Sequence, residues 1–83
     1  MNLSNILFIG LGNLGSALSI RIAEASQQLM IYDLNLQVRD EIQEKHPNLL
    51  GVDLPAGFSE ANVILTCLPN SKDVQSVVDL ALR

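Results

Sequence analysis

A short apolar run that ends in a glycine-rich turn constrains the fold of this 83-residue chain more than any other feature. Residues 6–9 read Ile-Leu-Phe-Ile, and residues 10–15 read Gly-Leu-Gly-Asn-Leu-Gly, a G-x-G-x-x-G pattern. The apolar run predicts a buried strand, followed by a helix. Gly10 permits a tight turn, Gly12 leaves the backbone open to close approach, and Gly15 lets the helix lie close to the sheet. The N–H groups that begin this helix would form an anion site.

The rest of the chain alternates between predicted strands and helices. Beside the first strand, we expect strands at residues 29–32 and 63–68 and a weaker one at 49–52. Helices are expected at about 13–26, at Leu34 to Pro47 and at 72–83, with a turn or short helix at 55–61. Leu14, Ala17, Leu18, Ile22 and Ala25 recur at helical spacing in the first helix, as do Val74, Val77, Val78 and Ala81 in the last.

This alternation predicts an α/β fold with a parallel sheet covered by helices on both faces. The expected strand order is 3-2-1-4, with residues 63–68 beside the first strand. That arrangement is the first half of a Rossmann-type dinucleotide-binding domain, so residues 1–83 would form a partial domain. Without the other half, residues 63–68 become an apolar sheet edge. We therefore expect the chain to self-associate or to belong to a longer protein.

The composition excludes several classes of protein. Net charge is −4 and the five basic residues are scattered, which argues against a nucleic-acid surface. One cysteine, Cys67, excludes an internal disulfide and fits a reducing compartment. No segment approaches the roughly 20 apolar residues of a membrane span, and the N-terminus lacks the positive region of a signal peptide. The sequence therefore predicts a soluble, cytoplasmic protein that binds neither nucleic acid nor membrane.

Asp33 is the second candidate for a binding role. It ends the predicted second strand, 18 positions after Gly15, near the spacing at which an acidic residue meets the adenosine ribose of a dinucleotide. Its carboxylate would accept hydrogen bonds from both ribose hydroxyls. It would also repel a 2′-phosphate by about 4 kcal/mol per charge pair at an effective dielectric near 20, which favours NAD over NADP. The alternative is that Asp33 merely caps the following helix.

Two segments resemble one family of enzymes. Residues 9–15, Ile-Gly-Leu-Gly-Asn-Leu-Gly, followed by Ala17, are similar to the I-G-L-G-x-M-G opening of the β-hydroxyacid dehydrogenases. That family includes 3-hydroxyisobutyrate dehydrogenase, tartronate semialdehyde reductase and 6-phosphogluconate dehydrogenase. Residues 68–70, Leu-Pro-Asn, with Val74 and Val77, resemble the family's L-P-x-x-x-x-V-x-x-V segment after the fourth strand. The resemblance covers nearly the whole chain but only the first half of the family's cofactor domain.

The resemblance implies a cofactor site and a reaction. It assigns the pyrophosphate to residues 10–15, the adenosine ribose to Asp33 and a wall along the cofactor to residues 68–70. The implied activity is hydride transfer between NAD and a small β-hydroxyacid. The family's catalytic lysine and substrate-binding glycine-rich segment have no match here, so we assign no catalytic residue and leave Lys45 and Lys72 without such a role. The implied cofactor contacts are Gly10, Leu11, Gly12, Asn13, Leu14, Gly15, Asp33, Leu68, Pro69 and Asn70.

Other readings of function remain open at this stage. A non-enzymatic module that senses NAD or AMP would need only this half-fold. A reductase of the prephenate dehydrogenase or pyrroline-carboxylate reductase type would share the same cofactor half. Cys67 is better explained as a core thiol than as a nucleophile, because His46, the single histidine, is expected to be exposed at a helix end. These two residues, 21 positions apart, do not suggest a metal site.

Overall fold

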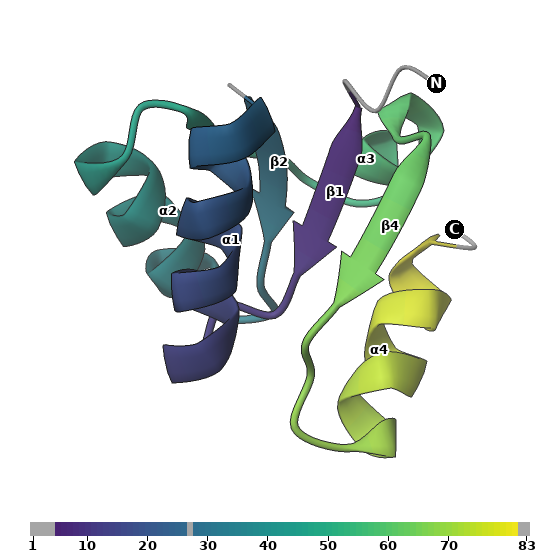
Figure 1. Ribbon diagram of the computed structural model, residues 1–83. Coiled ribbons are helices and arrows are strands. Elements are labelled where there is room, and N and C mark those ends of the chain that lie inside the picture. Colours follow the sequence, from purple (N-terminus) through teal and green to yellow (C-terminus); the bar gives the residue numbers. More distant parts are fainter. Residues whose placement is uncertain (1–4, 27, 82–83) are drawn as a thin grey trace.

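The computed structural model describes residues 5–26 and 28–81. Strands and helices alternate along this part of the chain, and Figure 1 shows the helices placed around one central sheet. The strands are β1 (Ile6–Ile9), β2 (Leu29–Tyr32), β3 (Leu49–Gly51) and β4 (Val63–Thr66). The helices are α1 (Asn13–Ser26), α2 (Leu36–Lys45), α3 (Ala56–Glu60) and α4 (Ser71–Ala81).

The four strands form one parallel sheet in the order β3-β2-β1-β4, which confirms the predicted fold class and topology. In this register Phe8 of β1 lies opposite Ile31 of β2 and Leu65 of β4. All four residues of β1 are buried, as expected for an apolar strand with neighbours on both sides. The glycine-rich turn therefore begins at the end of a buried strand that has neighbours on both sides.

Each face of the sheet has its own apolar core, because successive strand residues point to opposite faces. Ile6 and Phe8 belong to the core that also contains Ala23 of α1 and the partly buried Ile42 of α2. The alternate residues of β1 belong to the other core, which contains Val77 of α4. Helices α1 and α2 thus cover one face, and α3 and α4 cover the other.

The predicted buried face of α1 is wrong in most of its members. Ala17, Leu18 and Ala25 are exposed, Leu14 is 65% exposed, and Ile22 is partly buried. The fully buried residues of the helix are instead small, namely Gly15, Ser19 and Ala23 at four-residue spacing, and the partly buried Ile20 and Ile22 also pack against the core. The Ser19 hydroxyl is satisfied inside this contact by the Ser16 carbonyl oxygen, at 2.9 Å.

The reason for this face is the close approach of α1 to the glycine-rich turn. A Cβ atom added to Gly15 would collide with the carbonyl of Gly10 and would lie 3.5 Å from the ring of Phe8. A helix so close to the backbone accommodates only small side chains where it contacts the glycine-rich turn. The larger leucines are displaced to the sides of the helix.

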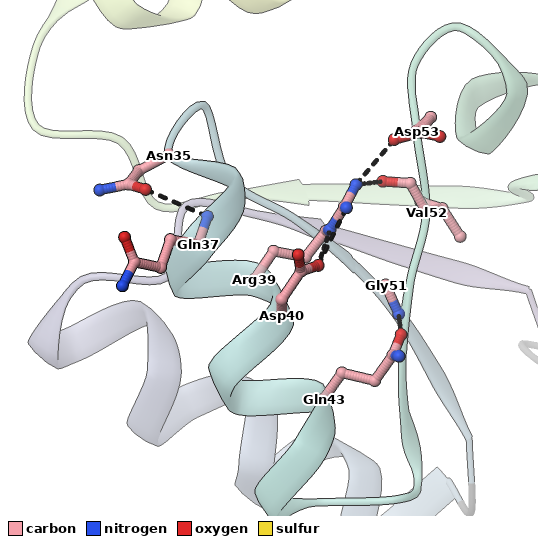
Figure 2. Close-up of polar contacts among 8 residues, drawn as sticks. All are labelled: Asn35, Gln37, Arg39, Asp40, Gln43, Gly51, Val52 and Asp53. Atoms are coloured by element: carbon pink, nitrogen blue, oxygen red, sulfur yellow. Dashed lines mark hydrogen bonds and ion pairs between the residues drawn. The ribbon is translucent and has the colours of Figure 1, made fainter.

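Helix α2 begins two residues later than Leu34, where the sequence placed its start. Asn35 is the N-cap, and its side-chain oxygen accepts a hydrogen bond from the Gln37 N–H at 3.1 Å (Figure 2). Leu34 lies outside the helix and is exposed. None of the residues in α2 is fully buried, although Val38 and Ile42 pack against the core.

Polar side chains attach α2 to β3 and to the segment that follows it (Figure 2). The Arg39 guanidinium donates to the Val52 carbonyl oxygen at 2.9 Å and to the Asp53 carboxylate at 2.7 Å. The Gln43 side chain accepts a hydrogen bond from the Gly51 N–H. A Cβ atom on Gly51 would lie 2.7 Å from that Gln43 oxygen and 3.1 Å from Arg39 Cδ, so the absence of a side chain there permits both contacts.

The ends of two predicted elements also shift. Strand β4 ends at Thr66 rather than at residue 68, although the Cys67 N–H still donates to the Ile9 carbonyl at 2.8 Å. In α4, Val77 is buried as predicted, but Val74 and Val78 are exposed and Leu80 packs against the core instead. The side chain of Ala81 and residues 82–83 lie outside the described part. Across residues 5–26 and 28–81, no helix has both the length and the apolar character needed to cross a membrane.

Candidate functional site

A cavity of about 570 Å³ opens beyond the carboxyl ends of β1, β2 and β4. Its volume falls in the range of small-molecule sites, which is roughly 300–1,000 Å³. In open parallel sheets, ligands bind at this edge, where the connections on either side of one strand leave in opposite directions. The lining residues are Gly10, Leu11, Gly12, Asn13, Leu14, Gly15, Asp33, Leu34, Asn35, Cys67, Leu68, Pro69 and Asp73.

The structure brings together nine of the ten predicted cofactor contacts in this cavity, and Asn70 is the exception. Asn70 lies just before α4, where its side-chain oxygen accepts the Asp73 N–H at 3.0 Å. This bond satisfies one of the N–H groups that the first turn of a helix leaves without a partner. Asn70 therefore helps to fix the start of α4, beside Leu68 and Pro69.

The first residue of the glycine turn has a backbone conformation that glycine adopts far more readily than other residues. Gly10 has a φ of 103°, and its N–H donates to the Tyr32 carbonyl at 3.0 Å. An added Cβ at Gly10 would collide with the backbone carbonyl of Cys67, which follows β4. The turn is therefore held between the ends of β2 and β4.

Gly12 differs from the other two glycines of the motif. A Cβ atom added there would meet nothing within 4 Å, so packing inside the protein does not require glycine at this position. Gly12 lines the cavity, and a side chain at this position would extend into the open space. This is the geometry expected where the backbone must lie close to a ligand such as a pyrophosphate.

The start of α1 supplies hydrogen-bond donors to the same space. The Gly12 carbonyl accepts the Ser16 N–H at 2.8 Å, so Gly12 caps α1 directly before its first residue, Asn13. The first N–H groups of a helix have no partner within it, and together with the helix dipole they favour an anion. No acidic side chain lies in the first turn of α1, so none competes for these donors.

Asp33 connects the glycine turn to the end of β2. Its Oδ2 atom accepts the Leu11 N–H at 2.7 Å, and its Oδ1 atom accepts the Asn35 N–H at 2.8 Å. The alternative hypothesis, that Asp33 merely caps the following helix, is wrong because the N-cap of α2 is Asn35. Each carboxylate oxygen has a further lone pair, so Asp33 can still accept hydrogen bonds from ligand hydroxyls.

Four residues of the lining were not among the predicted contacts, and these are Leu34, Asn35, Cys67 and Asp73. The first two follow Asp33 directly, and their position beyond the end of a strand is the signal that was available. Asp73 lies in the first turn of α4 and is partly buried. Among the described residues the lining contains the carboxylates of Asp33 and Asp73 and no lysine or arginine. A bound phosphate group would therefore be held by backbone N–H groups.

Cys67 and His46 lie in different cavities. Cys67 is half-buried, packs against the core and lines the large cavity, and its thiol is free. His46 is partly buried rather than exposed. It is the C-cap of α2 and lines a second cavity of about 120 Å³ with Glu24 and Pro47. Within the described ranges, no cluster of three potential metal-binding side chains occurs.

Comparisons with known proteins agree with this geometry. The chain is 34% identical over 71 residues to a probable mitochondrial 3-hydroxyisobutyrate dehydrogenase of Dictyostelium discoideum, covering 84% of this chain and 22% of that protein. It is 31% identical over 80 residues to an uncharacterized oxidoreductase of Synechocystis, covering 94% of this chain and 27% of that protein. The chain thus spans about a quarter of the length of these relatives. No solved structure gives a significant match.

The remaining comparison covers almost the whole chain. Residues 5–82 match the family described as the NAD-binding domain of 6-phosphogluconate dehydrogenase. The match includes the glycine turn, Asp33 and the segment after β4, which are the parts that meet in the large cavity. The resemblance seen in the sequence is therefore confirmed, and the chain belongs to the family of NAD-binding domains of 6-phosphogluconate dehydrogenase.

Proposed function

We propose that this chain is the NAD-binding part of an oxidoreductase that transfers a hydride between the nicotinamide cofactor and a small β-hydroxyacid. The observation that carries the proposal is the position of the Asp33 carboxylate beside the glycine turn, in one cavity with Leu68 and Pro69. The turn would hold the pyrophosphate, Asp33 the adenosine ribose, and Leu68 and Pro69 the nicotinamide side.

The preference for NAD over NADP rests on charge. Asp33 and Asp73 give the cavity negative charge, and its described lining has no basic side chain to pair with a 2′-phosphate. A 2′-phosphate beside Asp33 would be repelled, whereas a ribose hydroxyl there would donate a hydrogen bond. Leu34, the next residue of the lining, has no polar side-chain group that could offset this repulsion by binding the 2′-phosphate.

The substrate class is proposed from the relatives. One of them is named as a probable 3-hydroxyisobutyrate dehydrogenase, and the sequence resembles the β-hydroxyacid dehydrogenases as a group. The bound cofactor would supply the hydride chemistry, and this chain would bind and orient it. The general acid/base, a lysine by resemblance, and the substrate-binding groups would lie in a part of the protein that this chain does not include.

Calorimetric titration of the protein with NAD, NADP and AMP tests the proposal. We expect NAD to bind at least tenfold more tightly than NADP, because only NADP brings a phosphate to Asp33. We also expect NAD to bind more tightly than AMP, because AMP cannot contact the Leu68–Pro69 wall. Equal or tighter binding of NADP would show that the role given to Asp33 is wrong. AMP binding as tight as that of NAD would favour the nucleotide-sensing alternative.

An Asp73→Asn variant is the matched control. It removes one carboxylate from the same cavity but leaves Asp33 in place. If the preference for NAD arises at Asp33, Asp73→Asn should keep most of the NAD/NADP ratio, whereas Asp33→Asn should reduce it severalfold. A similar reduction in both variants would mean that the overall charge of the cavity, not a ribose contact, sets the preference.

A further inference from the structure

We infer that Asp33 is also a positioning residue for the glycine turn, and that it couples the ribose side of the site to the pyrophosphate side. This inference deepens the proposed function and rests on it for the identity of the ligand. Its structural part concerns only residues of this chain. It begins from the two hydrogen bonds that the Asp33 carboxylate accepts from the backbone.

The bond to Leu11 lies directly beyond the end of the ladder between β1 and β2. The Gly10 N–H pairs with the Tyr32 carbonyl, as the next step of the ladder between β1 and β2. One residue further, beyond the end of β1, the Leu11 N–H donates to the Asp33 carboxylate at 2.7 Å. The carboxylate therefore extends the contact between the two strands into the glycine turn.

The setting of Leu11 makes this bond important for the shape of the turn. Leu11 is 2% exposed, and its side chain is anchored in the core beneath α1. With its side chain fixed inside, the residue cannot readily turn its N–H toward solvent. A charge-assisted bond is also stronger than one between neutral groups. Without the carboxylate, the Leu11 N–H would lose this hydrogen bond, and the turn would keep its contact with β2 through Gly10.

The second bond makes Asp33 a bridge. Its other oxygen holds the Asn35 N–H in the turn that leads into α2, and Asn35 and Leu34 line the cavity beside it. One carboxylate thus fixes two backbone segments of the site. A ligand hydroxyl that binds Asp33 would act on a group already tied to the glycine turn. Ribose binding and pyrophosphate binding would therefore not be independent.

A positioning role and a purely electrostatic role for Asp33 predict opposite changes in anion affinity when the carboxylate is removed. Removing a carboxylate from an anion site should strengthen the binding of a free anion, if charge is all that changes. If the carboxylate holds the turn, removing it should weaken that binding. Asparagine has nearly the shape of aspartate but can present only one oxygen, so it cannot accept both N–H groups. Asp33→Asn therefore separates the two roles.

The experiment is an NMR study of the protein and two variants, Asp33→Asn and Asp73→Asn, with inorganic pyrophosphate as the probe. In the unmodified protein without ligand, we expect the Leu11 amide to exchange slowly with solvent. In Asp33→Asn we expect that protection to fall at least tenfold while the β1 amides keep theirs, and pyrophosphate to bind at least threefold more weakly. Asp73→Asn should keep the Leu11 protection and bind pyrophosphate equally or more tightly.

Two results would overturn the inference. One is a Leu11 amide that exchanges like an unprotected one in the unmodified protein, a measurement that needs no variant to fold. The other is an Asp33→Asn variant with unchanged Leu11 protection and equal or tighter pyrophosphate binding. Failure of the proposed function is seen separately, as a protein that keeps Leu11 protected and binds pyrophosphate but does not prefer NAD.

Discussion

The α-carbon of Gly10 faces the backbone carbonyl of Cys67 so closely that a single added carbon at Gly10 would overlap the carbonyl oxygen. The turn after β1 and the segment after β4 are therefore in direct contact, although they lie far apart in the sequence. Gly12, two residues later, has open space where its side chain would be. The first glycine of the motif serves the fold, and the second is available to a ligand.

This difference predicts opposite results for two similar substitutions. Gly10→Ala should lower the free energy of unfolding by about 2–5 kcal/mol, through the positive φ and the collision with Cys67. Gly12→Ala should change it by less than about 1 kcal/mol, because Gly12 is at a helix start and its Cβ meets no atom. Gly12→Ala should nevertheless weaken NAD binding at least tenfold. Urea denaturation and calorimetry measure both effects, and unchanged NAD affinity in Gly12→Ala would contradict the pyrophosphate role.

The strands and their order could be predicted from the sequence because they depend on patterns that the chain itself displays. A run such as residues 6–9 is too short and too apolar for anything but a buried strand, and a glycine turn after it implies a parallel neighbour. The site was predicted on other grounds: Asp33 was placed by its spacing from the glycine turn, and Leu68 by the family resemblance. Both lie in one cavity because residues after strand ends meet at one edge of a parallel sheet.

The inner face of α1 could not be predicted in this way. Spacing rules select the most apolar stripe, which contains Leu14 and Leu18, but close packing at Gly15 favours small residues. That condition depends on the distance between helix and sheet, which is a tertiary property. For the same reason the bond between Asp33 and Leu11 was not foreseen, since it depends on where the glycine turn lies relative to β2.

Arg39 offers a test of which polar contact attaches α2 to the sheet. Its side chain is 14% exposed, whereas that of Asp53 is 80% exposed, so water weakens the ion pair between them. The hydrogen bond to the Val52 carbonyl and the buried stem of Arg39 should contribute more. We expect Arg39→Ala to lower the free energy of unfolding by about 1–2 kcal/mol, and Asp53→Asn by less than about 0.5 kcal/mol. Equal losses in chemical denaturation would assign the attachment to the ion pair instead.

Ionisation of the Tyr32 hydroxyl should lower the stability of the folded protein at alkaline pH. Burial raises the pKa of its hydroxyl above the ordinary value of 10.0; the Arg39 charge acts against this shift, and the charges of Asp53 and Asp33 add to it. The folded protein therefore holds the phenol proton more tightly than the unfolded chain. This contribution to stability is complete below about pH 10 and is lost as the pH rises through the folded pKa.

Urea denaturation between pH 8 and 11.5 checks this sign. The protein should lose stability above pH 10 more steeply than Tyr32→Phe, by up to about 1.4 kcal/mol per pH unit, the limit for one proton. Phenylalanine keeps the ring in the core but cannot ionise, so any loss that remains in that variant belongs to other groups. Identical slopes in the two proteins would show that Tyr32 ionises as readily when folded as when unfolded.

Strand β4 lies at the edge of the sheet but has the apolar side chains that are typical of an interior strand. Ile64 is 42% exposed and Leu65 is 36% exposed, on opposite faces of the sheet, and the described residues provide no strand beyond them. An apolar edge with free backbone groups tends to pair with another chain. The 83-residue chain should therefore show concentration-dependent association in sedimentation velocity.

Ile64→Lys should shift this association toward the monomer, because a charge on the edge strand opposes pairing. Val78→Lys is the control, since Val78 is equally exposed but lies on α4 and not on the edge. A chain that stays monomeric at high concentration would refute edge pairing. Equal effects of the two lysine substitutions would show that association arises from nonspecific apolar contact and not from pairing of β4.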